Sequence, residues 1–228
     1  LRKIPGKMDI RPAEIVIEVR RSQVDKADKV KVDIDESIRR TKTALIIPDI
    51  HFGFIRDIET GKLTPIHDRR ALDVALQVAE LCDPDDVVYL GDKLDLADWS
   101  DKFIRSPEFY WTTQSAIVEG AWWMAQFRMI AGRARHRAIA GNHEARLTNG
   151  IVTNLSAAYN LRSVDNISTP ALSVRSLLGL DKIGVEYYDG ADARVWLNDY
   201  ICCIHGTVAR STPGGTVAAV IKTSDVTI

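Results

Sequence analysis

Apolar residues gather in short uninterrupted runs along this chain, and several of the runs end in polar residues. The runs that end in this way cover residues 44–48, 86–90, 138–140 and 200–204. Uninterrupted apolar runs of this kind are typical of buried strands, as in a parallel sheet. Between the first two runs a helix is predicted from Asp68, its N-cap, with apolar residues at helical spacing up to residue 79. The mixture of strands and helices indicates an α/β fold.

The second half of the chain continues this mixture of helical and extended patterns. A helix is predicted over residues 113–132, and residues 151–180 have a mostly helical pattern with polar interruptions. Strands are predicted at residues 183–188 and 193–197, before the apolar run at 200–204. Short Asp-Gly and Asn-Asp turns separate these three segments, as expected for neighbouring strands.

A charged segment precedes the first buried run. Residues 1–43 are rich in Lys, Arg, Asp and Glu, and include a candidate strand at residues 15–19. A chain of 228 residues suffices for one large domain or two small ones. We therefore divide it into an N-terminal extension, residues 1–43, and one domain, residues 44–228. The favoured interpretation of the extension is a solvated tail, and the alternative is an arm that packs on the domain or on a partner and supports an oligomer.

Composition narrows the class of protein. Hydrophobic residues make up 46% of the chain and charged residues 27%, as in a soluble globular protein. The net charge of −1 gives no general attraction to polyanions, although a local basic cleft stays open as an alternative. Cys82, Cys202 and Cys203 suit buried thiols in a reducing compartment, and hence a cytoplasmic protein, better than a disulfide framework. No apolar run is long enough to cross a bilayer, so no membrane partner is expected.

Polar side chains at the ends of the predicted strands carry the candidate chemistry. They are Asp49, His51, Asp92, Asn142, His143 and His205. Alternation along an extended strand would place Asp49 and His51 on the same face, although a capping Asp beside an unrelated loop His is the structural alternative. Mixed oxygen and nitrogen ligands suit Mn, Fe, Zn or similar ions. These residues offer more ligands than one ion normally takes from a protein. Two ions about 3.5–4 Å apart are therefore expected, with the central carboxylate of Asp92 as a bridge.

Other polar residues near these strand ends are given supporting roles. Asp95 and Asp98 follow Asp92 closely and are ranked below it, as caps or supports of the site. His67 is predicted to be a surface or capping residue in front of the first helix. The basic residues that lead into the third run are predicted to face solvent, namely Arg133, Arg135, His136 and Arg137.

Taken in order, the motifs Asp49-Ile50-His51, Gly91-Asp92, Gly141-Asn142-His143-Glu144 and His205-Gly206 resemble the calcineurin-like metallophosphoesterase superfamily. The resemblance covers roughly residues 44–228 and is strongest to small phage and bacterial members. It implies a two-sheet β-sandwich flanked by helices, in four layers. It also implies a hydrolase that cleaves phosphomonoesters or phosphodiesters, so a phosphate ester, including a nucleotide or nucleic acid, is the expected substrate.

The same resemblance implies a role for each matching residue. Asp49 and His51 would hold one metal ion, Asp92 would bridge, and Asn142 and His205 would hold the second ion. Manganese is the expected metal, with Fe, Zn, Ni or Mg as alternatives. A hydroxide that bridges the ions would attack phosphorus.

Two further residues are assigned to the substrate by the resemblance. His143 would stabilise the transition state or protonate the leaving oxygen, and Arg146 would contact the phosphate. Substrate choice would lie in the loops at 52–67 and 99–120. The aromatic residues of these loops are expected to lie in the core, and the alternative is that they form a surface on which a base stacks. They are Phe52, Phe54, Trp99, Phe109, Tyr110 and Trp111.

One departure from the superfamily pattern concerns its last motif, Gly-His-x-His, which this sequence does not contain. After His205 come a predicted helix at residues 216–222 and an apolar segment at 226–228 that resembles the start of a strand. We expect the chain to continue into a strand that carries two more histidines, and expect weak metal binding without them. The alternative is a metal-poor relative that uses the fold for binding instead of catalysis.

Overall fold

The computed structural model describes residues 42–100, 106–190 and 193–206. These described residues belong to one compact unit. The candidate strand at 15–19, the predicted helix at 216–222 and the apolar segment at 226–228 lie outside the described residues.

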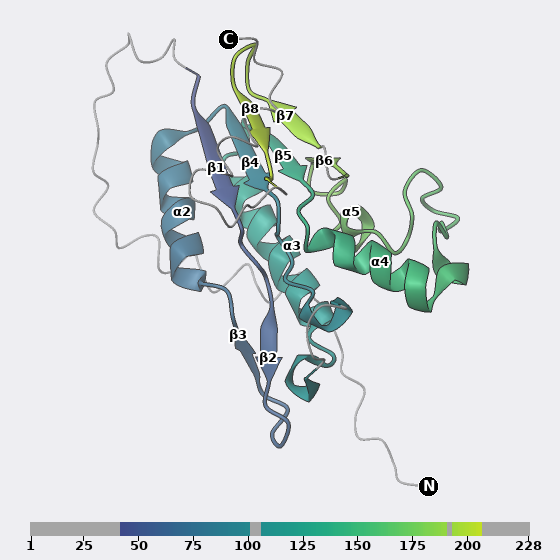
Figure 1. The fold of residues 1–228 in the computed structure, drawn as a ribbon. Helices are drawn as coiled ribbons and strands as arrows, with labels where there is room; N and C mark the ends of the chain where they lie inside the picture. Colours follow the sequence, from purple (N-terminus) through teal and green to yellow (C-terminus); the bar gives the residue numbers. More distant parts are fainter. Residues whose placement is uncertain (1–41, 101–105, 191–192, 207–228) are drawn as a thin grey trace, which may run out of the picture. The chain divides into compact units, whose positions relative to one another are not determined.

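A four-stranded parallel sheet forms the centre of this unit (Figure 1). Its strands, in spatial order, are β1 (Ala44–Pro48), β4 (Asp86–Leu90), β5 (Arg135–Ile139) and β6 (Val185–Tyr188). β4 is interior and almost wholly buried, as its apolar run predicts. β1 is confirmed as a strand, but the prediction that it is buried is wrong, because β1 is an edge strand in which only Ile47 is fully buried.

Two helices cover one face of the parallel sheet. They are α2 (Arg69–Cys82) and α3 (Thr113–Ile130), and they pack side by side. Alternate residues of β4, Val87 and Tyr89, belong to the same apolar cluster as the inner faces of these helices, which include Leu72, Leu76, Trp123 and Phe127. Asp68 caps α2 as predicted, because its carboxylate accepts hydrogen bonds from the backbone N–H groups of Arg70 and Ala71 at 2.8 and 3.1 Å.

A small antiparallel sheet covers the opposite face. It consists of β7 (Arg194–Trp196) and β8 (Cys202–Ile204). Val195 packs against Val88 and Ile139 of the parallel sheet in a second, smaller core. The unit is therefore an α/β structure with a parallel sheet and a small antiparallel sheet, flanked by helices.

A buried arginine links the two sheets, and it corrects a prediction. Arg137 lies within β5 and donates hydrogen bonds to the Asp86 carboxylate at 2.7 Å and to the Trp196 carbonyl at 2.8 Å. Arg137 and His136 are 3% and 1% exposed, so the prediction that both face solvent is wrong. The pairing explains the burial, since a buried charge needs a charged or hydrogen-bonding partner.

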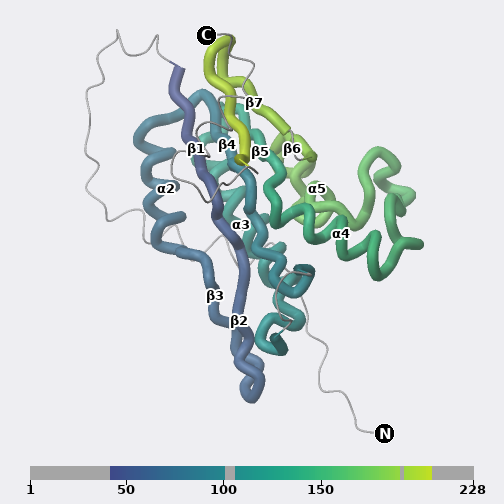
Figure 2. The backbone as a smooth tube through the Cα atoms, viewed as in Figure 1, coloured from purple at the N-terminus to yellow at the C-terminus, as the bar shows by residue number. Residues whose placement is uncertain are grey.

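The remaining elements lie outside these layers. Where a loop was predicted, β2 (Phe54–Arg56) and β3 (Leu63–Pro65) form a hairpin that continues the path of β1 beyond the sheet (Figure 2). The helical prediction for residues 151–180 is largely wrong, since α4 (Glu144–Asn154) ends early. Only short turns of helix follow it, namely η4 (Ser156–Ala158) and α5 (Val174–Leu177). Two more lie earlier in the chain, η2 (Ala97–Trp99) and η3 (Pro107–Phe109).

The predicted burial of the cysteines and of the aromatic residues is confirmed for some residues and wrong for others. All three cysteines are free, but Cys82 is exposed and the other two are half-buried, so the prediction of buried thiols is wrong. Phe52 and Phe54 are core residues, as predicted, whereas Trp111 is 77% exposed. Within the described part of the chain, no helix is long and apolar enough to cross a membrane.

His67 also differs from its prediction. Its side chain is fully buried, and its Nε2 lies 2.8 Å from Oε1 of Glu119 on α3. Arg69 donates two hydrogen bonds to the same carboxylate, at 2.6 and 2.5 Å. Burial raises the pKa of Glu119, but the hydrogen bonds from His67 and Arg69 outweigh burial and bring this pKa down to about 2. The cluster fastens the start of α2 to α3.

We expect Glu119→Gln to lower the free energy of unfolding at pH 7 by about 1–3 kcal/mol, because it removes a charged acceptor from a buried partner. The contribution of Glu119 is complete above its ordinary pKa of 4.5 and is lost as the pH falls from there toward 2. Urea unfolding measured at several pH values should show a smaller acid loss in the variant than in the wild type. Glu80→Gln, on the exposed side of α2, is the control. Identical acid profiles for wild type and Glu119→Gln would contradict this assignment.

Candidate metal centre

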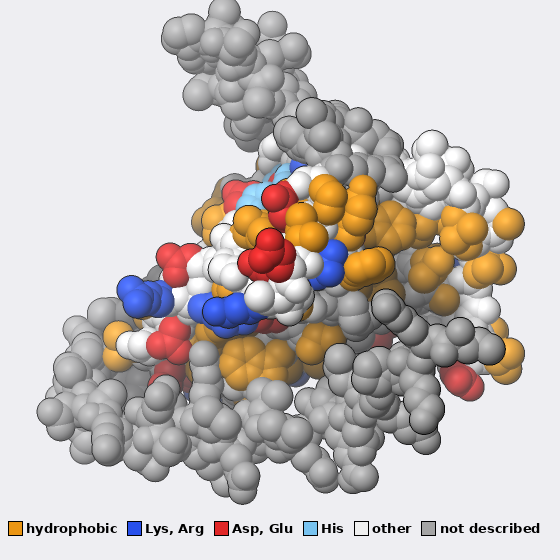
Figure 3. All heavy atoms as spheres, turned by 90° about the horizontal axis from the view of Figure 1, so that it is seen from below, with side chains coloured by type: hydrophobic (Ala, Val, Ile, Leu, Met, Phe, Trp, Pro, Cys, Tyr) orange, Lys and Arg blue, Asp and Glu red, His pale blue; other side chains and the backbone are white. Residues whose placement is uncertain are grey.

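Five polar side chains meet at the end of the parallel sheet where its strands finish. Asp49 and His51 follow β1, Asp92 follows β4, and His143 follows β5. His205 comes from the other sheet, directly after β8. Because carboxyl ends of parallel strands lie at one edge of a sheet, four polar residues from three strands reach the same place. Histidine and acidic side chains are visible side by side at the surface (Figure 3).

The carboxylate of Asp92 lies at the centre of this group. Its Oδ2 is 3.6 Å from Nε2 of His205, 3.8 Å from Nε2 of His143 and 4.0 Å from Nε2 of His51. Nε2 of His205 also lies 3.2 Å from Oδ1 of Asp49. Asp92 is almost fully buried, so three imidazoles approach one carboxylate that is largely shielded from water.

Two overlapping sets of three side chains have the spacing of metal ligands. One is Asp49, His51 and Asp92, and the other is His51, His143 and Asp95. Within each set, one ligand atom per residue lies within 4.8 Å of the others. The first set contains three of the five predicted metal ligands. The second contains His143, which the sequence resemblance assigns to the substrate, and Asp95, which was ranked below Asp92.

The backbone at these positions differs from the prediction. Asp49, His51 and Asp92 have φ angles of 48°, 52° and 36°, in the left-handed region. Asp49 and His51 therefore do not alternate along an extended strand. His51 reaches the site beside Asp92, whose backbone carbonyl oxygen accepts a hydrogen bond from the His51 N–H at 2.9 Å. Left-handed backbone at residues other than glycine costs of order 1–3 kcal/mol each and is concentrated at functional sites.

Two glycines allow the strands to approach so closely. A Cβ atom at Gly91 would lie 1.9 Å from the imidazole of His205, and one at Gly141 would lie 2.1 Å from Oδ1 of Asp92. Neither position can hold a side chain without moving a candidate ligand. The glycines that precede Asp92 and Asn142 in the sequence motifs are therefore required by space at the site.

Beneath the site, Glu144 joins the two central loops. One carboxylate oxygen accepts hydrogen bonds from the backbone N–H groups of Lys93 and Leu94, at 2.7 and 3.0 Å, and the other accepts from Gly141 at 2.7 Å. The ammonium group of Lys93 is fully buried, 3.6 Å from the same carboxylate and 2.6 Å from the carbonyl oxygen of Ile139. Burial lowers the pKa of Lys93, while the charge of Glu144 opposes that shift.

His143 lies between acidic and basic neighbours. Its Nδ1 is 2.8 Å from the carbonyl oxygen of Asp95 and 3.3 Å from the Asp95 carboxylate. Burial lowers the pKa of His143, but the hydrogen bond with Asp95 and the charge of Asp92 outweigh burial, so the pKa is raised above its ordinary value. Burial raises the pKa of Asp95, and its hydrogen bond with His143 outweighs this and lowers it.

Arg146, predicted to contact substrate phosphate, lies against His143. Its Nη2 is 2.8 Å from Nε2 of His143, and its Nη1 donates to the carbonyl oxygen of Asp95 at 2.8 Å. The first contact needs an unprotonated Nε2, because a guanidinium can only donate. Protonation of His143 at Nε2 would therefore break that hydrogen bond.

Asn142 is the predicted metal ligand for which no polar contact with the others is found among the described residues. Its side chain is exposed and forms no hydrogen bond within the described part of the chain. Asp98, also given a supporting role, accepts a hydrogen bond from Thr113 at 2.8 Å. The sequence analysis ranks Asp95 too low, because its role depends on a contact with His143, which is 48 residues away in the chain.

Two observations bear on whether a divalent ion fits here. The buried Nδ1 atom of His51, which lies 3.7 Å from the Asp95 carboxylate, has no hydrogen-bond partner among the described residues. Buried polar nitrogens without partners are unfavourable unless something else binds them. Carboxylate oxygens and imidazole nitrogens are also the donor set that Mn, Fe and Zn accept. The residues present fit a bound divalent ion.

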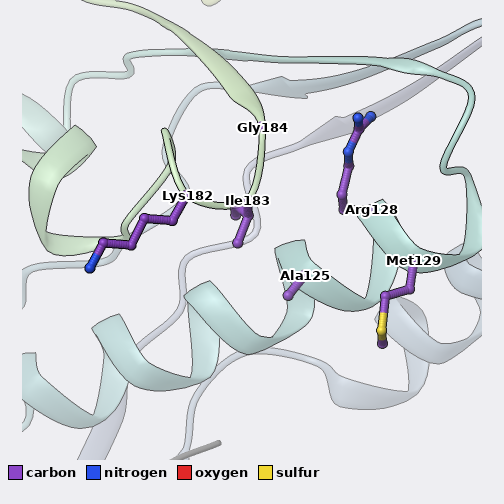
Figure 4. A pocket seen from close by; sticks show the side chains of 6 residues that line it. All are labelled: Ala125, Arg128, Met129, Lys182, Ile183 and Gly184. Atoms are coloured by element: carbon purple, nitrogen blue, oxygen red, sulfur yellow. The ribbon is translucent and has the colours of Figure 1, made fainter.

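A separate pocket of about 390 Å³ lies away from these ligands, between α3 and the loop before β6 (Figure 4). It is lined by Ala125, Arg128, Met129, Lys182, Ile183 and Gly184. The guanidinium of Arg128 already donates to the carbonyl oxygen of Ala134 at 2.8 Å, and the side chain of Lys182 points away from the other labelled residues. The pocket therefore presents no converging polar groups.

Comparison with known proteins adds no family assignment. No protein-family model matches the sequence, and neither a curated protein nor a solved structure is significantly similar to it. The geometry of the site and the sequence motifs therefore carry the functional argument.

We expect Gly91→Ala to weaken Mn²⁺ binding by about tenfold or more, because the new methyl group must displace the imidazole of His205. Gly179→Ala is a matched control. Gly179 also has a positive φ, 61° against 69° for Gly91, but a Cβ atom there would meet nothing within 4 Å. Both variants share the backbone strain, so both should lose stability, and isothermal titration should show an affinity loss only for Gly91→Ala. Equal Mn²⁺ affinities would show that His205 is not a ligand.

Proposed function

We propose that this chain is a metal-dependent phosphoesterase that hydrolyses phosphomonoesters or phosphodiesters. The observation that carries the proposal is the set Asp49, His51 and Asp92, with ligand atoms within 4.8 Å of one another, beside an imidazole that is not needed as a ligand. A divalent ion held there would neutralise phosphate charge and lower the pKa of a water molecule. His143 provides a group that can transfer a proton next to it.

Each residue of the site has a separate role in this proposal. Asp49, His51, Asp92 and His205 would hold the metal. The backbone N–H of His143 donates to Oδ1 of Asp92 at 2.8 Å, so the carboxylate is fixed in direction before any ion binds. Asp95 orients the ring of His143 through Nδ1, which leaves Nε2 as the atom that gives or takes a proton.

Arg146 completes the proposed substrate site. In the absence of substrate its guanidinium lies against Nε2 of His143, at 2.8 Å. When His143 carries a proton, this contact is lost and the guanidinium becomes available to a phosphate oxygen. A protonated His143 and a released Arg146 would then face the same phosphate, one at the leaving oxygen and the other at a non-bridging oxygen.

We also propose that the fold is that of the calcineurin-like metallophosphoesterases. Supporting this, the parallel sheet packs against a second sheet and carries helices α2 and α3 on its other face. The four motifs occupy the ends of β1, β4, β5 and β8, the positions that the resemblance requires.

A metal-poor binding protein is the second candidate function. Asn142 favours it, because the ligand predicted for the second ion is exposed and makes no hydrogen bond in the described part of the chain. His205, the other predicted ligand of that ion, lies nearest to Asp49, 3.2 Å away. The two candidates differ in whether the chain binds Mn²⁺ and turns over a phosphate ester.

We expect the chain with added Mn²⁺ to hydrolyse p-nitrophenyl phosphate or its bis-ester, and Asp92→Asn to lose this activity. Replacing one carboxylate oxygen by an NH₂ group removes a charge from the centre of three imidazoles. Asp165→Asn, an exposed carboxylate in the loop after α4, is the matched control and should keep full activity. Absence of both Mn²⁺ binding and hydrolysis in the wild type would support the binding protein instead.

We expect His143→Ala to reduce turnover by about 10²–10⁴-fold, because a positioned acid–base group is lost. Bound metal, measured by atomic absorption after gel filtration, should remain near the wild-type amount. A loss of metal together with turnover would instead assign His143 to the second ligand set, with His51 and Asp95.

A further inference from the structure

An exposed tryptophan beside the β2–β3 hairpin is not explained by burial in the core. Trp111 lies between η3 and α3 and is 77% exposed, so little of its indole contributes to the core. Its φ angle of 62° is in the left-handed region, which is unfavourable for a bulky residue. Because burial does not compensate for this backbone conformation, the conformation indicates a role for the exposed ring.

Arg56 of the β2–β3 hairpin lies over this ring. Its guanidinium carbon is 4.6 Å from the centroid of the Trp111 ring, at the distance of a cation–π interaction. The Nε atom of Arg56 has no hydrogen-bond partner among the described residues. Tyr110, next to Trp111, is 40% exposed. Arg56, Tyr110 and Trp111 form a surface that we call the Trp111 platform.

The platform is connected to the candidate metal centre along two segments. Arg56 follows His51 by five residues, so at most about 17 Å of extended chain separates them. On the other side, Thr113 accepts a hydrogen bond from Trp99 at 3.0 Å and donates one to Asp98 at 2.8 Å. These contacts hold the chain just after Trp111 to the loop that also carries Asp95.

Charge around the platform is balanced. Arg56 and Lys62 of the hairpin are matched by Asp57 and Glu59, and acidic and basic side chains lie close together on this side of the unit (Figure 3). Asp57 is occupied by hydrogen bonds from Thr60, at 2.7 and 2.8 Å. Attraction to a polyanion is therefore weak, and binding at the platform must come mainly from the ring and the guanidinium.

We propose that the Trp111 platform stacks a base of single-stranded nucleic acid whose phosphate, a few nucleotides away, reaches the metal centre. The proposal rests on the proposed phosphoesterase function and specifies its substrate. An exposed indole offers a flat apolar face to any base, and a guanidinium beside it strengthens stacking and can also contact a phosphate. An oligonucleotide can extend from the platform to the metal centre over several nucleotides, and competition with a mononucleotide distinguishes the two ligands.

The test is binding of a fluorescein-labelled oligothymidylate of about ten nucleotides to the full chain, measured by fluorescence anisotropy with EDTA present. EDTA prevents hydrolysis, so binding is measured apart from metal-dependent activity. Trp111→Gly should reduce the affinity about tenfold or more, and Trp111→Phe should keep most of it. Glycine suits the left-handed backbone, so the melting temperature of Trp111→Gly should not fall. Trp196→Ala, which removes a half-exposed tryptophan of β7, is the control and should bind as the wild type does.

Three results would overturn the proposal. They are equal binding by Trp111→Gly and wild type, competition by thymidine monophosphate as effective as by the oligonucleotide, and a steep decrease of affinity with salt, which would indicate phosphate contacts instead of stacking. Hydrolysis of p-nitrophenyl phosphate by the wild type tests the phosphoesterase function separately. Hydrolysis without Trp111-dependent binding refutes the platform alone. Trp111-dependent binding without hydrolysis refutes the phosphoesterase and with it the role of the platform in presenting a substrate.

Discussion

The carboxylate of Glu144 is the interaction on which the arrangement of the site depends. It accepts three backbone hydrogen bonds, two from the loop after β4 and one from the loop after β5, and it neutralises the fully buried ammonium of Lys93. Breaking a buried ion pair from one side leaves an uncompensated charge, which is strongly destabilising. The relative position of Asp92 and His143 is therefore determined by the buried carboxylate of Glu144 and its hydrogen bonds to the two loops.

Much of the fold follows from local pattern. The apolar runs at 44–48 and 86–90 are strands, Asp68 caps the first helix, and polar residues at strand ends lie together because parallel strands finish at one edge. In the same way the motifs predicted Asp49, His51, Asp92, His143 and His205 as neighbours. The pattern did not predict the left-handed φ angles of Asp49 and His51, because neither residue is a glycine or lies in a predicted turn.

Burial of charge was the main source of wrong predictions. Arg137 and His67 are polar residues that the pattern assigns to the surface, yet each is buried because a specific partner lies opposite, namely Asp86 and Glu119. Such partners are distant in sequence and cannot be identified from spacing alone. Asp95 was underrated for the same reason, because its importance comes from its contact with His143.

The origin of His205 has a mechanical consequence. This residue follows β8, whose partner strand β7 contacts the parallel sheet through Val195 and through the hydrogen bond from Arg137 to the Trp196 carbonyl oxygen. A cation that binds His205 together with Asp49 or Asp92 would cross-link two layers whose direct contact is small. Occupancy of the centre and attachment of the β7–β8 hairpin are thus linked equilibria, in which each stabilises the other.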